Sequence, residues 1–264
     1  MLKRALRTLL WITVALNCVT VTHAATTNDN DVYYDDFEST SADQSDPYQT
    51  YNRHAFNFND TLDKAIFKPV AQAYNFVLPY QVRKGVRNFF NNLDMIPTVF
   101  NDVLQGKINY TASDTWRFVV NSTLGIGGLI DIAKPLGMPL HEEDFGLTLA
   151  TWGYKESNFF ILPLLGPHTV RDALAVPVDY VTSAYYYIDN DWIHYSLIAL
   201  NWTSQRAQFL EYDKTMKQAA FDPYVFQRNA YMQHRRNLVD NNDDNLSDYK
   251  RLLREIANKR AGIK

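Results

Sequence analysis

The sequence predicts a mainly α-helical domain whose helices are short and frequently interrupted. From residue 46 onward, apolar residues recur three or four positions apart, whereas strict alternation of apolar and polar residues is scarce. Ten prolines and ten glycines punctuate the chain, and they divide this pattern more often than a simple helical bundle requires. We find no strand–helix–strand rhythm and no internal repeat, so the pattern is not typical of an α/β or a solenoid protein.

The first 24 residues have the layout of a cleaved export signal. A positive start (Lys3, Arg4 and Arg7) precedes an apolar stretch over residues 9–16, and residues 22–24 (Thr-His-Ala) suit a signal peptidase. The apolar stretch is too short to span a bilayer, and polar residues follow it. A buried helix and a mitochondrial presequence are alternatives that fit this pattern less well.

Cys18 is the only cysteine. Cleavage after Ala24 would leave a mature protein without a thiol, stabilised by its core alone in an oxidising compartment. Cleavage before Cys18 would instead make this residue a lipid-anchored first residue. The preceding residues 15–17 (Ala-Leu-Asn) match the usual bacterial lipidation signal poorly, and the sequence leaves both outcomes open.

Charge and composition divide the rest of the chain. Residues 25–45 are rich in Asp, Asn, Ser and Thr and lack Lys and Arg, which predicts a disordered acidic linker. We expect a helical domain over residues 46–239 and a polar, basic tail over residues 240–264. The body is almost neutral, which does not favour nucleic acid as a partner, because nucleic-acid-binding domains normally present a basic surface.

The domain is predicted to open with an amphipathic helix. Asp46 is expected to be its N-cap, and Pro47 suits the first helical position. The apolar positions recur at helical spacing: Tyr48, Tyr51, Ala55, Phe58, Leu62 and Ile66. Further short helices are expected near residues 82–89, 99–104 and 112–123, with Gly106 as the C-cap of the second.

The second half is rich in aromatic residues after Pro167. An amphipathic helix is expected from about Thr203 to Ala220, and another is expected to begin at Asp222-Pro223. Beyond the signal, no apolar run reaches the roughly 20 residues that span a bilayer. The densest apolar patch, residues 159–166, is split by a proline. A membrane protein of this kind would lie in one leaflet or at an interface, and an ordinary soluble helical core is the alternative.

Catalytic signatures are scarce. The sequence has no Gly-x-Ser-x-Gly elbow, Walker loop or His-Glu-x-x-His helix, and we predict no catalytic residue, cofactor or metal site. The best acid–base candidates are His141, Glu142, Glu143 and Asp144. Because adjacent loop residues seldom converge on one point, we interpret this run mainly as the cap of a helix that starts near Phe145.

Two other motifs suggest structural roles. Gly125, Gly127 and Gly128 superficially resemble a dinucleotide loop, but they follow a helical stretch and lack the later third glycine. Flexible or closely packed backbone is the better interpretation. Arg171 and Asp172 are expected to form a local ion pair or to face a polar path.

Several short motifs between residue 46 and about residue 236 occur in a recognisable order. They include GVRNFFNNL at 85–93, LQG at 104–106, RFVVN at 117–121, GIGGLID at 125–131, EDFGLTL at 143–149, LPLLGP at 162–167 and DPY at 222–224. On these motifs the chain resembles the MlaA/VacJ family of outer-membrane phospholipid-transport proteins. It departs from the usual family pattern at Cys18, at residues 154–158, where a Gly/Pro-rich turn is common, and at Ala175, where Gly is common.

The resemblance implies an all-α, ring-like arrangement of interrupted amphipathic helices lying in the inner leaflet of a Gram-negative outer membrane. A polar channel through the ring would let mislocalised phospholipid leave the outer leaflet, without catalysis, and so maintain lipid asymmetry. The resemblance also implies a position on the periplasmic face, a trimeric porin as partner and a soluble periplasmic carrier that receives the lipid.

Seven residues are expected to shape or gate this lipid path, although each could equally be a cap, a close contact or an ion pair. They are Asn59, Gly125, Gly127, Gly128, Asp131, Arg171 and Asp172. Two functions from other classes are the alternatives. One is a periplasmic lipid hydrolase built on His141 and the carboxylates of residues 142–144, and the other is a soluble periplasmic structural or adhesion module.

Overall fold

The computed structural model describes residues 46–211, 213 and 222–240. The predicted export signal with Cys18, the acidic linker and residues 241–264 of the tail lie outside these residues. Within them, the predicted mainly helical fold is confirmed. The elements in chain order are α3 (Gln49–Leu62), η2 (Asp63–Phe67), α4 (Lys68–Val77), α5 (Tyr80–Leu93), α6 (Met95–Gln105), α7 (Ile108–Thr123), η3 (Lys134–Leu136), α8 (Phe145–Thr151), β1 (Phe159–Leu162), β2 (Gly166–Thr169), α9 (Val170–Thr182), η4 (Ala184–Tyr187) and α10 (Asp191–Phe209). A last helix, over residues 223–240, follows.

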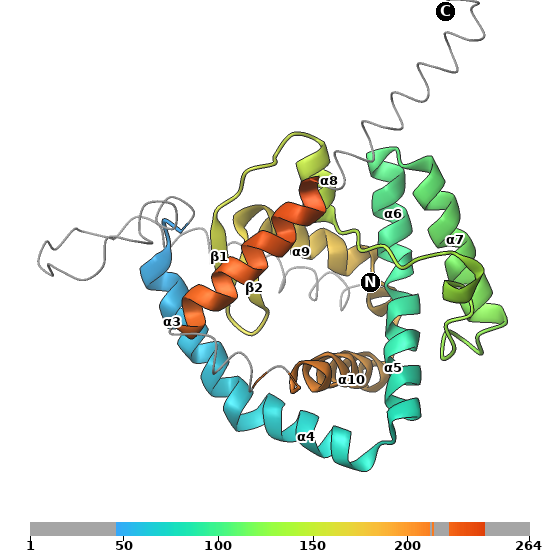
Figure 1. The fold of residues 1–264 in the computed structure, drawn as a ribbon, viewed down its shortest axis with the longest axis horizontal. Helices are drawn as coiled ribbons and strands as arrows, with labels where there is room; N and C mark the ends of the chain where they lie inside the picture. The colour runs from blue at the N-terminus through green and yellow to red at the C-terminus, as the bar shows by residue number, and fades with distance from the viewer. Residues whose placement is uncertain (1–45, 212, 214–221, 241–264) are drawn as a thin grey trace, which may run out of the picture.

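The helices are arranged as a ring, as predicted (Figure 1). α3, α4, α5 and α6 follow one another around the rim, and α10 lies inside it, packed on α4 and α5. The helix over residues 223–240, orange-red in Figure 1, crosses from the α3 side of the ring toward α8. Segments far apart in the sequence therefore enclose a common interior.

Local sequence explains the corners of the ring. Leu78 is extended, with φ −98° and ψ 127°, because the residue before a proline is disfavoured in the helical region, and α5 begins directly after Pro79. Gly106 ends α6 in the left-handed conformation with φ 72°, which confirms the predicted C-cap. The backbone therefore bends at Pro79 and at Gly106, whereas Pro177 lies inside α9.

Asp46 is not the N-cap of the first helix, so this prediction is wrong. α3 begins at Gln49, and no side chain caps it. The Asp46 carboxylate is instead buried, where it accepts hydrogen bonds from Asn52 (2.7 Å) and the Tyr224 hydroxyl and pairs with Arg228 at 3.4 Å. The buried guanidinium attracts this carboxylate more strongly than the exposed N–H groups of a helix end do.

The predicted helix start at Thr203 is also wrong, and residues 212 and 214–220 of that predicted helix lie outside the described residues. α10 starts twelve residues earlier, because Asn190 caps it by accepting a hydrogen bond from the backbone N–H of Ile193 (3.1 Å). The aromatic residues 192, 195 and 202 lie on this helix. By contrast, the helix predicted at residues 222–223 is confirmed: the Asp222 carboxylate accepts from the N–H groups of Tyr224 and Val225.

The densest apolar patch forms a small antiparallel hairpin that the periodicity did not predict. β1 pairs with β2 from Phe159 opposite Thr169 to Leu162 opposite Gly166. All four residues of β1 are buried, so the strand lacks the alternation that usually identifies one. Among the described residues, no helix combines the length and apolar character needed to cross a bilayer.

Candidate functional site

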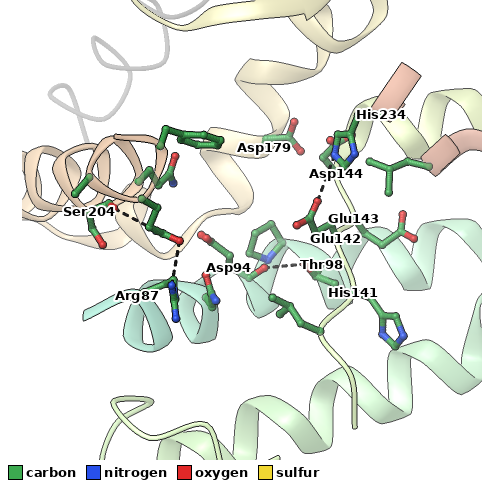
Figure 2. Close-up of a pocket in the computed structure, with 18 of the residues that line it drawn as sticks. Arg87, Asp94, Thr98, His141, Glu142, Glu143, Asp144, Asp179, Ser204 and His234 are labelled. Atoms are coloured by element: carbon green, nitrogen blue, oxygen red, sulfur yellow. Dashed lines mark hydrogen bonds and ion pairs between the residues drawn. The ribbon is translucent and has the colours of Figure 1, made fainter. Parts of the chain in front are cut away.

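A cavity of about 1020 Å³ occupies the interior of the ring (Figure 2). Its walls come from α4, α5, the start of α6, the segment before α8, β2, α9, α10 and the helix over residues 223–240. Acidic and basic side chains from α5, the segment before α8, β2, α9 and the last helix line it, together with Asp94 and Glu211: Arg83, Lys84, Arg87, Asp94, His141, Glu142, Glu143, Asp144, His168, Asp172, Asp179, Glu211, His234 and Arg235. Charged groups this numerous do not form a hydrocarbon core, so the interior is suited to polar cargo or water.

A second cavity, of about 1010 Å³, adjoins the first along α5. Lys84, Arg87, Asn91 and Leu140 line both of them. Leu129, Ile130, Asp131, Arg117 and Lys134 are among the residues that line only the second. The two cavities together extend from the interior of the ring, past α5, to the loop that follows α7.

One face of α5 separates these cavities. Lys84, Arg87, Asn91 and Asp94 are spaced three, four and three residues apart, which places them on a single helix face. We refer to these four residues as the α5 polar stripe. The stripe begins with two cations and ends with a carboxylate, and Figure 2 shows Arg87 and Asp94 on the same wall of the first cavity.

Acidic groups gather at the other end of the first cavity. Burial raises the pKa of Asp94 to about 6. Burial, and then the nearby Asp144, raise the pKa of Asp179 to about 7. Figure 2 shows Asp179, Glu142 and Asp144 across the cavity from Arg87. Cations without a carboxylate partner therefore lie along α5, and carboxylates lie across the cavity from them and at Asp94, while Arg235 is paired with Asp144 and Asp172.

The predicted acid–base run at residues 141–144 does not converge on one point. His141 pairs with Asp114 at 3.0 Å, and Glu143 with Lys107 at 2.6 Å. Glu142 lies 3.7 Å from the exposed His234. Asp144 is the N-cap of α8, accepting from the N–H of Leu147 at 2.8 Å, as the cap interpretation predicted. Four neighbouring side chains thus have four different partners, an arrangement that does not resemble a catalytic centre.

Behind this run lies a buried acidic cluster between α6 and α7. Asp102 is fully buried, and no donor among the described residues hydrogen-bonds to either of its carboxylate oxygens. Burial, followed by the charges of Asp114 and Glu143, raises the pKa of Asp102 to about 8. The folded protein therefore favours the protonated form of this carboxyl group at neutral pH.

The free energy of unfolding is expected to fall as the pH rises from about 5 to about 8. Asp94, Asp179 and Asp102 all have folded-state pKa values above the ordinary 3.8, so folding favours their protonated forms. The stability that these protonated carboxyl groups contribute is complete below about pH 4. It is lost as the pH passes the folded-state pKa values of about 6 for Asp94, about 7 for Asp179 and about 8 for Asp102.

Asp102→Asn, which stays neutral, is expected to stabilise the protein by about 3 kcal/mol more at pH 8 than at pH 5. Chemical denaturation in detergent at both pH values measures this difference. Asp60→Asn is the control, because Asp60 is a partly exposed carboxylate paired with Lys64. An equal effect of Asp102→Asn at both pH values would contradict the prediction.

A second buried network joins α8, α9 and the last helix. Arg235 donates to Asp144 at 2.6 and 3.1 Å and to Asp172 at 2.7 Å, and the Tyr231 hydroxyl donates to Asp172 at 2.9 Å. Burial alone would raise the pKa of Asp172, but the charges of Arg235 and Arg171 hold it below its usual value. Two guanidinium groups therefore keep Asp172 ionised.

Arg171 and Asp172 form the predicted ion pair, at 3.1 Å, but only Asp172 lines the cavity. Arg171 lies behind the wall, where it donates to the carbonyls of Tyr154 (3.2 Å) and Lys155 (2.9 Å). It therefore fixes the start of the 154–158 segment, where the sequence departs from the usual family pattern.

The other predicted path residues lie on different elements. Asn59 donates to the Leu162 carbonyl (3.1 Å) and accepts from the N–H of Leu164 (2.8 Å), which holds the β1–β2 turn. Asp131 lines the second cavity and pairs with Arg117 at 2.7 Å. Residues 125–128 form a tight loop that lines neither cavity. The role of all seven residues in a lipid path stays a prediction.

Sequence reasoning singled out several cavity carboxylates, among them Asp131, Asp144 and Asp172, but it missed the cations of α5, Asp94, Asp179 and Arg235. The α5 polar stripe was visible as the spacing 84, 87, 91 and 94 within and beside the motif at residues 85–93. Arg235 gave no such signal, because its partners Asp144 and Asp172 lie 91 and 63 residues away.

Comparison with known proteins adds to this geometry. The family model of the MlaA lipoprotein matches residues 44–238. An uncharacterised protein of Rickettsia prowazekii, RP093, is 34% identical over 76% of this chain and 82% of its own length. The intermembrane phospholipid transport system lipoprotein MlaA of Escherichia coli is 33% identical over 72% of this chain and 76% of its own length.

A solved structure is also similar. It is described as the structural basis for maintenance of bacterial outer membrane lipid asymmetry, and the matching chain is 31% identical with a TM-score of 0.65. The match covers 74% of this chain and 99% of the other.

Proposed function

Because this chain belongs to the MlaA lipoprotein family, we propose that it removes mislocalised phospholipid from the outer leaflet of the outer membrane through the polar interior of its ring. It is a phospholipid-transport protein that maintains outer-membrane lipid asymmetry. The observation that carries the route is the contrast between the charged cavities inside the ring and the apolar side chains on its rim.

The rim is unusually apolar for an exposed surface. Phe76 on α4 is 92% exposed, and Trp116 on α7 is 62% exposed. Other large apolar side chains on the ring helices are also exposed: Phe58, Ile66, Val70, Val77, Val103 and Ile108. Such a surface is costly in water and favourable in a lipid leaflet.

The dimensions support a position in one leaflet. An α-helix with its side chains is about 10–12 Å across, and half of a hydrocarbon core is about 15 Å thick. Helices that lie flat would therefore fill one leaflet without crossing the other. Inside the ring, charged side chains would let a headgroup pass without crossing bare hydrocarbon, which is costly.

We place the ring at the periplasmic face of the outer membrane. There it would receive phospholipid beside a trimeric porin and pass it to a soluble periplasmic carrier. No enzymatic step is included, because the residues at 141–144 have separate partners and the proposed task changes no covalent bond.

Cells that lack the protein are expected to accumulate phospholipid in the outer leaflet, and re-expression of the intact chain is expected to reverse this. A double charge reversal, Lys84→Glu with Arg87→Glu, should fail to restore asymmetry, because it makes the shared wall of both cavities repel a phosphate. Outer-leaflet phospholipid, labelled from outside the cell, measures the result at matched protein levels.

Two other variants serve as controls. Arg236→Glu changes an exposed residue next to the network of Arg235 and is expected to restore asymmetry. His141→Gln is also expected to restore it, and failure of this variant alone would favour a hydrolase. Normal asymmetry in cells without the protein would contradict the proposed function.

A further inference from the structure

The first cavity presents opposite charges at its two ends. Three of its cations, Arg83, Lys84 and Arg87, come from α5, whereas Arg235 at the acidic end is paired with Asp144 and Asp172. The carboxylate of Asp94 lies seven residues after Arg87, which is about 10 Å along the helix axis, and Asp179 of α9 lines the same cavity. A ligand with one charge of each sign would match this arrangement.

The cationic end has hydrogen-bonding groups without partners. The Tyr74 hydroxyl and the Nε of Arg83 are buried in this wall, and neither has a hydrogen-bond partner among the described residues. Arg83 is held in place by its own Nη1, which donates to Asn75 at 2.6 Å. Buried donors are normally satisfied, so these two atoms point to a ligand oxygen that the protein itself does not supply.

Lys84 and Arg87 add charge beside these donors. Within the described part of the chain, Lys84 makes no ion pair or hydrogen bond, and Arg87 makes only a 3.3 Å bond to the neutral Gln208. Cations that are not neutralised by a carboxylate remain available to an anion, and a phosphate accepts several hydrogen bonds from such groups at once.

The acidic end has matching groups. No side chain among the described residues donates to the Asp94 carboxylate, whose neighbour Thr98 bonds instead to the Asp94 carbonyl. Asp179 accepts one backbone N–H, from Phe145, and has a second oxygen that is not used in that bond. An ammonium group beside either of these carboxylates would offset the cost of burying it.

We propose that the first cavity is a binding site for a zwitterionic phospholipid headgroup, with the phosphate at Arg83, Lys84 and Arg87 and the ammonium at Asp94 and Asp179. A two-carbon ethanolamine link, together with the reach of the Arg and Asp side chains, spans the separation along α5. The acyl chains would leave past apolar residues of the lining, such as Val176, Phe209 and Leu238. This inference rests on the proposed function and names its preferred substrate.

The test uses the full chain in detergent micelles that contain phosphatidylethanolamine or phosphatidylglycerol at equal mole fraction. Bound lipid is counted by native mass spectrometry. We expect the ethanolamine lipid to be preferred about tenfold, the size of one charge-assisted contact, and Asp94→Asn to remove that preference. Arg87→Gln should weaken the binding of both lipids by about tenfold.

Matched controls change charge outside the cavity. Asp60→Asn and Arg236→Gln are expected to leave both affinities unchanged, because neither residue lines the cavity. Asp179→Asn provides a second test of the acidic end, in case Asp94→Asn does not fold. Water-soluble glycerophosphoethanolamine is expected to displace little lipid, and full displacement at equimolar amounts would overturn the assignment to a lipid.

The remaining outcomes separate the two proposals. Equal binding of the two lipids by the unmodified protein, or an unchanged preference in both Asp94→Asn and Asp179→Asn, would overturn the headgroup site and leave lipid transport standing. Absence of any bound lipid would overturn both.

Discussion

Replacing Arg235 with Met is expected to lower the free energy of unfolding by about 3 kcal/mol, because it removes the cation that joins α8, α9 and the last helix. Arg235 is 8% exposed and contacts two carboxylates. Asp172 would keep Arg171 as a partner, and Asp144 is exposed enough to be hydrated. The expected loss of stability is therefore smaller than for a carboxylate left buried without any partner.

Chemical denaturation in detergent at pH 7 tests this expectation. Arg236→Met is the matched control, since the adjacent side chain is exposed and its replacement should change stability by less than about 0.5 kcal/mol. Equal stability of the two variants would mean that the Arg235 network does not hold the last helix in place.

This network also accounts for part of a sequence motif. Gly146, in the motif at residues 143–149, lies where a Cβ atom would come within 2.3 Å of the Asp172 carboxylate and 3.0 Å of Arg235. Only a residue without a side chain leaves room for that ion pair. Arg235 lies near the end of the helix over residues 223–240. The start of that helix is held by Arg228 and Tyr224, which bind Asp46. The helix over residues 223–240 is thus fixed across the ring at both ends.

The sequence predicted the helices well where local chemistry sets their ends. Pro79 and Gly106 have backbone preferences that act within one or two residues, and the structure bends at both. Asp46 was misjudged because its partners, Tyr224 and Arg228, lie about 180 residues away in the sequence. A local pattern cannot predict a competitor at that distance.

The direction in which each amphipathic face points was less predictable. The sequence leaves open what the first helix packs against. In the structure, Asn52 of its polar face is fully buried and holds β1 through the Phe159 carbonyl and the Ile161 N–H. Apolar Phe58 of the same helix is 50% exposed. Periodicity shows that a helix has an apolar face and a polar face. Which of the two faces the protein interior depends on the medium around the protein, which here is a lipid leaflet.

The second large effect on stability is expected in the loop after α7. Gly125→Ala is expected to lower the free energy of unfolding by about 3 kcal/mol, because a Cβ atom there would lie 2.2 Å from the Ile130 carbonyl oxygen and 2.4 Å from that of Asn121. Both obstacles are backbone atoms, so relief requires the loop itself to move.

Movement of this loop would also affect the proposed lipid path. The loop carries Leu129, Ile130 and Asp131, which line the second cavity, and Asn121 holds Asp131 by donating at 3.1 Å. Gly125→Ala should therefore impair restoration of outer-membrane asymmetry in cells as well as stability in detergent. Loss of stability with full restoration would show that the position of Asp131 does not matter for transport.

Gly127→Ala is the matched control in the same loop. Gly127 has a φ of +67°, but no atom lies within 4 Å of the position that a Cβ would take. The expected cost is therefore only the strain of a left-handed alanine, about 1 kcal/mol. Denaturation of both variants separates close packing from backbone strain. If Gly127→Ala proved as damaging as Gly125→Ala, the close contacts of residue 125 with the carbonyl oxygens of Asn121 and Ile130 would not account for the larger cost expected there.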